Sequence, residues 1–259
     1  MSLITTELQN DIGTIAFNYG KYRNILSKAL IDEMIQAIDA LQKSKARVLI
    51  LRAPKGSTVW SAGHDVRELP LPGRDPLAYH DPLVTVLRAV QNLAMPVIAM
   101  IEGSVWGGAC DLALSCDILI GGRSCSFCMT PAKIGVPYNV SGILHFINIM
   151  GVNTAKEMFF TAQPISAEKA CTIGILNHLV EDDQLEEFTY DMARKITKNS
   201  PLSIAVIKEQ IRLLASAHPM SPLTFERVQG LRRQVYDSND YAEGIRAFNE
   251  KRKPQFTGE

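Results

Sequence analysis

Two glycine-containing corners of the chain carry residues whose type and spacing allow chemistry. One is Ser61-Ala62-Gly63-His64-Asp65, and the other is Gly107-Gly108, which follows an apolar stretch that begins at Pro96. Glycine accepts positive φ and lets a ligand approach the backbone closely. Two N–H groups from such corners, here those of His64 and Gly108, can converge on one oxygen and form an oxyanion hole. Either corner alone also fits an ordinary tight turn, so the prediction depends on the pair.

The residue pattern gives little support for a nucleotide-binding loop or a metal site. Neither G-x-G-x-x-G nor G-x-x-x-x-G-K occurs, so the glycines do not predict a nucleotide phosphate loop. Cys125 and Cys128 are spaced C-x-x-C, but no second cysteine pair or His-x-x-x-His follows them. The five histidines are scattered along the chain. We therefore expect no metal site.

The composition is that of an ordinary globular protein. Of the 259 residues, 46% are hydrophobic and 21% are charged, and the formal net charge is zero. No overall field therefore attracts nucleic acid or an anionic membrane. No signal peptide is visible, and no apolar run reaches the roughly 20 residues that span a bilayer. The odd number of cysteines argues against a disulfide framework. We expect a cytoplasmic protein with no nucleic-acid or membrane partner.

The first part of the chain predicts strands around a helix. Residues 12–18 alternate between apolar and polar types, and residues 48–51 form an apolar run too short for a helix. Between them, apolar residues at helical spacing predict a helix over residues 28–42, with Ser27 as its N-cap. This order predicts a right-handed crossover between parallel strands. A loop rich in proline and glycine over residues 69–82 is expected to be a flexible cover over a site.

The remaining chain changes from strands to helices. Further strands are predicted at residues 97–101, 118–120 and 126–129, and a helix at residues 83–93. Beyond residue 140 the predicted helices cover residues 142–150, 153–160, 167–172, 185–199, 201–217, 222–236 and 240–251. The sequence thus predicts an α/β core followed by an all-α C-terminal appendage. A helical tail without its own core is expected to pack on a neighbouring subunit.

Over nearly its whole length the sequence resembles the crotonase (enoyl-CoA hydratase/isomerase) superfamily. The matching segments are Phe17-Asn18, Asn24-Ile25-Leu26, Ser61-Ala62-Gly63-His64-Asp65, Glu102-Gly103, Gly107-Gly108-Ala109-Cys110-Asp111-Leu112, Cys116-Asp117 and Phe248-Asn249-Glu250-Lys251-Arg252. The resemblance implies a spiral of β-β-α turns over residues 1–196 and a helical trimerisation region over residues 197–259. It also implies homotrimers or homohexamers, acyl-CoA thioester substrates, and no cofactor besides the coenzyme A of the substrate. The N–H groups of His64 and Gly108 would hold the thioester oxygen as an enolate forms.

Departures from the hydratase pattern narrow the expected reaction. The hydratase pattern that the resemblance implies has two glutamates. In this chain, Asp111 and Pro131 stand at those two positions. Adding water across a double bond requires an acid and a base, so hydration is not expected to be efficient. Three segments instead resemble decarboxylating members of the superfamily: Gly103-Ser104-Val105-Trp106-Gly107-Gly108, Met129-Thr130-Pro131 and Gly135-Val136-Pro137-Tyr138-Asn139. The expected reaction is decarboxylation of methylmalonyl-CoA, or of malonyl-CoA, to propionyl-CoA or acetyl-CoA.

The expected reaction assigns roles within the site. Thr130 and Tyr138 offer neutral donors for the leaving carboxylate, and Trp106 is expected to form a wall. The proton for the enolate would come from Tyr138, His64 or water, and the sequence does not rank the three.

The remaining candidate substrate-binding residues are Lys21, Tyr22, Ala62, Asp65, Asp111, Pro131, Phe248 and Lys251. In the family, positions such as Lys21, Phe248 and Lys251 meet coenzyme A, although a solvated basic tail explains Lys251 equally well. Asp111 also fits a solvated or capping carboxylate in a first helical turn. Two alternatives stay open: another crotonase reaction, such as hydration, isomerisation or thioester hydrolysis, and a CoA-binding protein without catalysis.

Overall fold

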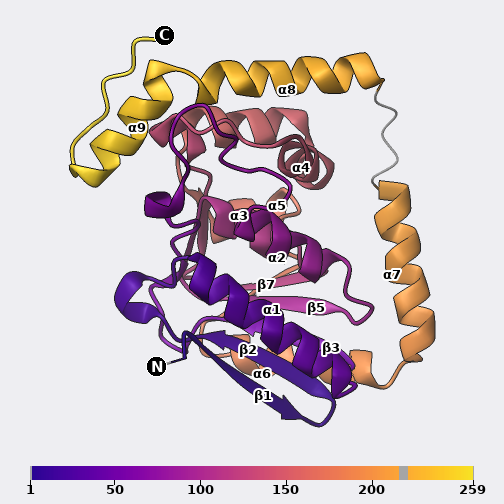
Figure 1. The fold of residues 1–259 in the computed structure, drawn as a ribbon. Coiled ribbons are helices and arrows are strands. Elements are labelled where there is room, and N and C mark those ends of the chain that lie inside the picture. The colour runs from indigo at the N-terminus through magenta and orange to yellow at the C-terminus, as the bar shows by residue number, and fades with distance from the viewer. Residues whose placement is uncertain (1, 216–220, 259) are drawn as a thin grey trace.

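Two sheets form the centre of the protein in the computed structural model, which describes residues 2–215 and 221–258 (Figure 1). The six-stranded sheet has the order β1-β2-β3-β5-β7-β10, and its strands are Ile4–Gln9, Ile12–Phe17, Val48–Arg52, Val97–Ile101, Ile118–Gly122 and His178–Val180. The four-stranded sheet has the order β4-β6-β8-β9, and its strands are Val59–Ser61, Ser104–Trp106, Ser126–Cys128 and Ile165–Ser166.

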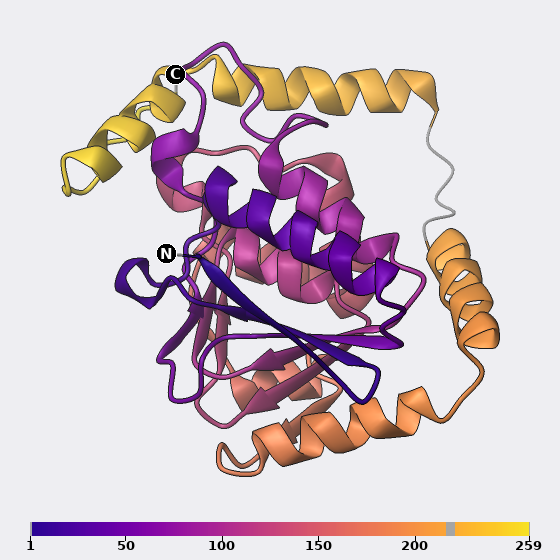
Figure 2. The ribbon, with the colours of Figure 1, turned by 60° about the horizontal axis from the view of Figure 1, so that its bottom comes forward.

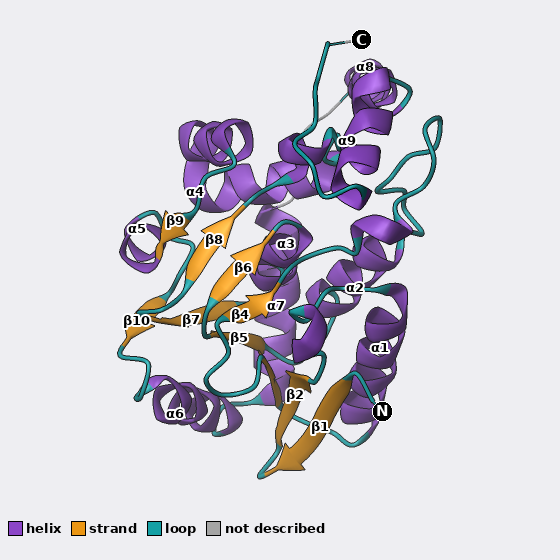
Figure 3. Cartoon of the chain, turned by 90° about the vertical axis from the view of Figure 1, so that its left-hand side faces the viewer, coloured by secondary structure: helices purple, strands orange, loops and turns teal. Residues whose placement is uncertain are grey.

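The chain builds both sheets together, by a repeated strand-strand-helix turn. β3 and β4 precede α2 (Pro82–Gln91), β5 and β6 precede α3 (Gly108–Leu114), and β7 and β8 precede α4 (Val140–Thr161). In each turn the first strand joins the larger sheet and the second joins the smaller one (Figure 3). This is the β-β-α spiral that the family resemblance implies. Consecutive turns therefore place the ends of β4, β6 and β8 side by side.

Helices cover both faces of the larger sheet. Figure 2 shows α1 (Lys28–Lys43) and α2 on one side and α6 (Leu185–Thr197) on the other. Every residue of β3 and β5 is buried, as expected for parallel strands covered on two faces. α1 begins as predicted, because the Ser27 side chain accepts a hydrogen bond from the Leu30 N–H at 3.3 Å.

The last helices extend away from this core. α7 (Pro201–Ala215) and α8 (Pro222–Tyr236) run along its outside, and α9 (Asn239–Asn249) returns toward it (Figure 1). Their exposed large apolar side chains are Leu202, Val206, Ile207, Ile211, Leu213, Leu214, Leu223, Phe225, Leu231, Val235 and Phe248. Within the described part of the chain, no helix is both long enough and apolar enough to cross a membrane.

Several predicted boundaries are wrong, and β1, β6, β9 and β10 are additional. The two helices predicted over residues 142–150 and 153–160 both lie within α4, on either side of a kink at Gly151, whose φ of 76° and ψ of 163° are not helical. α5 (Ala167–Thr172) matches its prediction. The predicted end of the helix over residues 201–217 lies outside the described residues. The division at residues 196 and 197 stays a prediction, and it falls within the last turn of α6.

The segment over residues 69–82 is tied to the C-terminal helices. Arg232 in α8 contacts both carboxylate oxygens of Asp75, the Tyr241 hydroxyl donates to the Pro70 carbonyl at 2.8 Å, and the Gly73 N–H donates to the Tyr236 carbonyl. Leu69 and Leu77 from the same segment line the mainly apolar pocket described below. The predicted cover is therefore present, but it is anchored at three places by polar contacts.

Candidate active site

The two glycine corners meet because they follow neighbouring parallel strands. β4 pairs with β6 through Val59 with Ser104 and Ser61 with Val105. Gly63 follows β4 with φ +84°, and a Cβ there would lie 2.3 Å from the Trp106 carbonyl oxygen and 3.1 Å from the Gly108 nitrogen. Only glycine fits such a contact, so the two corners pack directly against each other.

Two backbone N–H groups are left free at this junction. A Cβ on Gly108 would lie 3.6 Å from the His64 nitrogen, so the two amide nitrogens are near neighbours. Within the described residues, neither the His64 N–H nor the Gly108 N–H donates a hydrogen bond. Gly108 is the first residue of α3, where a helix provides no acceptor for the N–H. Both residues line a common pocket, so both donors are available to a ligand.

That pocket has a volume of about 560 Å³ and mainly apolar walls. Its apolar lining includes Ile25, Leu69, Leu77, Leu83, Ile134 and Val136. In such a weakly hydrated space, donors aimed at a developing negative charge are far more effective than in water. The pocket is thus suited to an acyl group whose oxygen becomes anionic.

The His64 imidazole forms part of the pocket wall. Its side chain is 11% exposed, and its Nε2 lies 3.6 Å from an Asp81 carboxylate oxygen. Neither ring nitrogen has a hydrogen-bond partner in the described part of the chain. A buried polar group without a partner is uncommon and indicates a place for a ligand or water.

The buried carboxylate of Asp111 links Tyr138, which lines the pocket, to His145 in α4. The Tyr138 hydroxyl donates to Oδ2 of Asp111 at 2.8 Å, and Nδ1 of His145 lies 2.9 Å from Oδ1 of the same carboxylate. Asp111 is 2% exposed, so the interpretation as a solvated carboxylate is wrong. Burial, and then the neighbouring Asp111, raise the pKa of the Tyr138 phenol well above its usual value. Tyr138 therefore remains a neutral phenol.

One carboxylate lines the pocket among the described residues, and it is already paired. Asp65 receives hydrogen bonds from Nε and Nη2 of Arg67 at 2.8 and 2.6 Å. The hydrogen bonds from Arg67 lower the pKa of Asp65 despite its burial. Pro131 occupies the pocket wall where the hydratase pattern has a glutamate. Among the described residues, the pocket thus lacks the two glutamates that serve as acid and base in the hydratase pattern.

The structure brings most of the predicted site residues together. Tyr22, Ala62, His64, Asp65, Gly108, Thr130, Pro131, Tyr138 and Phe248 all line the pocket. Lys21, Trp106, Asp111 and Lys251 do not line it. Lys21 lies over the Tyr22 ring, Trp106 donates its ring N–H to Ser104 at 2.8 Å, and Asp111 reaches the pocket only through Tyr138.

Sequence reasoning missed several residues of the site. Arg23 and Lys133 add positive charge to the pocket wall, and Leu83 packs against Gly108. Arg23 follows the predicted Lys21 and Tyr22 directly, so the sequence could have indicated it as a site residue. His145 had no such signal, because 34 residues separate it from Asp111.

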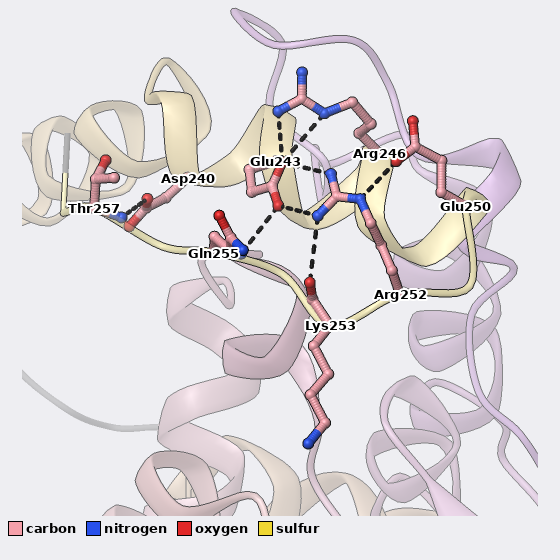
Figure 4. A network of polar contacts seen from close by, with 8 residues as sticks. All are labelled: Asp240, Glu243, Arg246, Glu250, Arg252, Lys253, Gln255 and Thr257. Carbon is pink, nitrogen blue, oxygen red and sulfur yellow. Dashed lines mark hydrogen bonds and ion pairs between the residues drawn. The ribbon is translucent and has the colours of Figure 1, made fainter.

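A polar network ties the residues that follow α9 to that helix (Figure 4). Glu243 of α9 accepts hydrogen bonds from Arg252, Arg246 and the Gln255 N–H, and Arg252 also contacts Glu250. These arginines, Arg252 first, lower the pKa of the Glu243 carboxyl. α9 also packs closely on the pocket wall, since a Cβ on Gly244 would lie 2.2 Å from the Ile134 carbonyl oxygen. Phe248 is thereby fixed at the pocket.

No group of three His, Cys, Asp or Glu side chains within the described residues is arranged to hold a metal ion. All five cysteines are free thiols, and Cys125 and Cys128 are both buried. The C-x-x-C spacing therefore reflects two buried thiols, one just before β8 and one at its end.

The spiral of paired sheets and the junction of free amides define an acyl-CoA enzyme of the crotonase type. The chain belongs to the enoyl-CoA hydratase/isomerase family, which matches residues 7–259.

It is 52% identical to methylmalonyl-CoA decarboxylase of Escherichia coli (strain K12), over 96% of this chain and 95% of that one. A solved structure of methylmalonyl-CoA decarboxylase in complex with 2-nitronate-propionyl-CoA has a TM-score of 0.97 and 50% identity, covering 99% of each chain. Another, complexed with 2S-carboxypropyl CoA, has a TM-score of 0.97 and 50% identity, covering 100% of this chain and 99% of that chain.

Proposed function

We propose that the protein decarboxylates methylmalonyl-CoA to propionyl-CoA, or malonyl-CoA to acetyl-CoA. One observation carries this proposal: the unpaired N–H groups of His64 and Gly108 lie together in a pocket without a free carboxylate among the described residues. The likeness to methylmalonyl-CoA decarboxylase at 52% identity supports the same reaction. Hydration is not favoured, because Asp65 is paired with Arg67 and Pro131 replaces a glutamate.

The reaction follows from these groups. The bond between the α-carbon and the carboxylate breaks, its electron pair forms the enolate, and CO₂ leaves. Negative charge gathers on the thioester oxygen, where the His64 and Gly108 N–H groups stabilise it. The α-carbon then takes one proton, which gives the propionyl thioester. The substrate carboxylate supplies the electrons, so this chemistry requires no cofactor.

Apolar walls assist the loss of CO₂. A carboxylate held in a poorly hydrated space loses the water that stabilises its charge, while the departing CO₂ is neutral. Pro131 and Val136 supply such a wall, and a glutamate at position 131 would repel the carboxylate. Thr130 and Tyr138 are the polar groups that we propose to orient the reacting end, and Tyr138, His64 or water delivers the proton.

The coenzyme A portion is expected near the cationic side chains of the pocket. Tyr22, Arg23, Lys133 and Phe248 are among the lining residues, and a cationic side chain is well suited to a phosphate. Lys21 and Lys251 lie outside the pocket lining of this chain. We propose that they contact the more distant phosphates, Lys251 either in its own subunit or in a neighbouring one.

We also propose that the chain forms a homotrimer or homohexamer and acts in the cytoplasm. The exposed apolar residues of α7 and α8 support the assembly, because such surfaces mark contacts with a partner. The free cysteines support a reducing compartment.

A panel of thioesters tests the proposed reaction. Purified protein is incubated with methylmalonyl-CoA, malonyl-CoA, crotonyl-CoA and butyryl-CoA, and the products are followed by mass spectrometry. We expect propionyl-CoA and CO₂ from the first, with one solvent-derived hydrogen on the α-carbon. Rapid hydration of crotonyl-CoA without CO₂ from either malonyl thioester would refute the proposal.

A further inference from the structure

His145 makes a contact that neither the oxyanion hole nor the coenzyme A site explains. It lies in α4, and its Nδ1 is 2.9 Å from Oδ1 of Asp111 in α3. The other oxygen of Asp111 accepts the Tyr138 hydroxyl at 2.8 Å. Tyr138 precedes α4 and lines the pocket, so the carboxylate bridges the pocket wall and the helix.

The chemistry of the carboxylate fixes the direction of both bonds. An ionised carboxylate only accepts hydrogen bonds, so Nδ1 of His145 carries the proton that lies between the two groups. The Tyr138 hydroxyl donates in the same way to Oδ2. Since Asp111 is 2% exposed, water does not replace either donor at low cost. Loss of the histidine would leave one buried oxygen without a partner.

The surroundings leave Asp111 as the hydrogen-bond partner of His145. His145 also lines a second cavity with Asp117, Lys208 and Arg212. Lys208 pairs with Asp117 at 2.7 Å, and Arg212 pairs with Glu209. Lys208 and Arg212 are thus each paired with another carboxylate, and the histidine is directed to Asp111.

We propose that His145 is a positioning residue, whose Nδ1–H holds Asp111 so that the carboxylate fixes the Tyr138 hydroxyl against the reacting end of the substrate. This inference rests on the proposed decarboxylation. Two hydrogen bonds lock the carboxylate plane, whereas one bond leaves it free to rotate about its Cβ–Cγ bond. The Tyr138 oxygen then presents its free lone pairs to the pocket in a constant direction. A water held there would be aimed at the enolate carbon.

Paired substitutions of His145 test the proposal. His145→Asn keeps an N–H donor near the position of Nδ1, whereas His145→Leu removes it at similar volume. We expect His145→Leu to lower kcat by about tenfold with KM within about twofold, since misplacement of a reacting group is costly without affecting binding. His145→Asn should retain most of the rate. His178→Leu, on β10 and in ring contact with Phe188, is the control, and it should keep the wild-type kcat.

A double-mutant comparison with Tyr138→Phe separates positioning from general damage. If His145 acts through the tyrosine, His145→Leu adds little to the loss already caused by Tyr138→Phe. An unchanged kcat in His145→Leu, or the same tenfold loss in the Tyr138→Phe background, overturns the inference. A wild-type protein that releases no CO₂ from any malonyl thioester refutes the proposed function. An active wild type whose kcat is unchanged in His145→Leu refutes only the positioning role, so the two failures are distinguishable.

Discussion

At the scale of single residues, the geometry of Gly63 sets the position of the His64 and Gly108 amides, which we propose to be catalytic. Its φ of +84° turns the chain toward the second corner, and the absent Cβ leaves room for the Trp106 carbonyl. A side chain at this position would push the second corner away, since nonbonded carbon and oxygen atoms require over about 3 Å. The separation of the His64 and Gly108 nitrogens would change with it.

Gly63→Ala should therefore reduce kcat/KM by about 10² to 10³, which is the usual effect of losing one oxyanion donor. Gly56→Ala is the matched control, because Gly56 has a φ of +81° but a Cβ there would meet no atom within 4 Å. Both variants carry similar backbone strain, so their difference in steady-state rates isolates the contact. Equal rates for the two variants would contradict this account of the junction.

Tyr138 gives a prediction about pH. Its raised pKa means that the folded protein favours the neutral phenol. The corresponding stability is full below the ordinary phenol pKa of about 10 and is lost only as pH rises through the higher folded value. The ultraviolet difference spectrum between wild type and Tyr138→Phe should show no tyrosinate from Tyr138 at a pH of about 10. Tyrosinate absorbance from this residue at that pH would be inconsistent with its burial beside Asp111.

The sequence predicted the site residues that belong to local motifs. It did not predict those that meet only because distant segments pack together. Gly63, His64 and Gly108 belong to recognisable segments, and the structure brings them together. Asp111 was ambiguous because a carboxylate in a first helical turn is favoured in water as well as in a buried bond. The distinction depends on His145, whose approach is decided by how α4 packs on α3.

At the scale of elements, buried strands and capped helices were predictable because their signals are local. β3 and β5 are continuous apolar runs, and α1 has both a periodic apolar face and its Ser27 cap. β1 was missed because five of its six residues are exposed, so no hydrophobic pattern marks it. β6 has only three residues and is defined by its neighbours β4 and β8.

The Glu243 network predicts a role for α9 in substrate binding. Glu243→Gln weakens the contacts with Arg246 and Arg252 that hold the tail, so Phe248 should lose its fixed place at the pocket. We expect KM for the CoA thioester to rise by about fivefold because the tail must then be ordered on binding, with kcat little changed. Glu250→Gln, which disturbs one exposed contact with Arg252, should show a smaller effect. A change in kcat alone would argue against this role.

At the scale of the whole molecule, α7 and α8 carry apolar side chains that the single chain leaves exposed. Leu214 is 77% exposed and Leu223 is 81% exposed, although both belong to helices (Figure 1). The sequence indicated a helical appendage from the run of predicted helices beyond residue 140, but the direction in which the helices leave the core depends on contacts between distant segments. Lys208 supplies one such contact, through Asp117 and the Met95 carbonyl.

Assembly gives the corresponding prediction. Sedimentation of the wild type should give a mass three or six times that of one chain. Leu214→Glu should shift the protein toward smaller species, because an unpaired charge in an apolar interface is costly. Gln210→Glu adds the same charge to the same helix at an exposed polar position and should leave the assembly intact. A wild type that sediments as a single chain would refute the oligomer proposal.

The spiral separates two tasks along the chain. The two amides that we propose to hold the enolate follow β4 and β6, which are strands of consecutive turns. The segment over residues 69–81 instead leaves the spiral between β4 and α2 and supplies Leu69 and Leu77 to the pocket. Insertions or substitutions in residues 69–81 would reshape the space for the acyl group without shifting the register of β4 and β6. Evolution can thus alter which thioester is accepted while the two amides keep their positions.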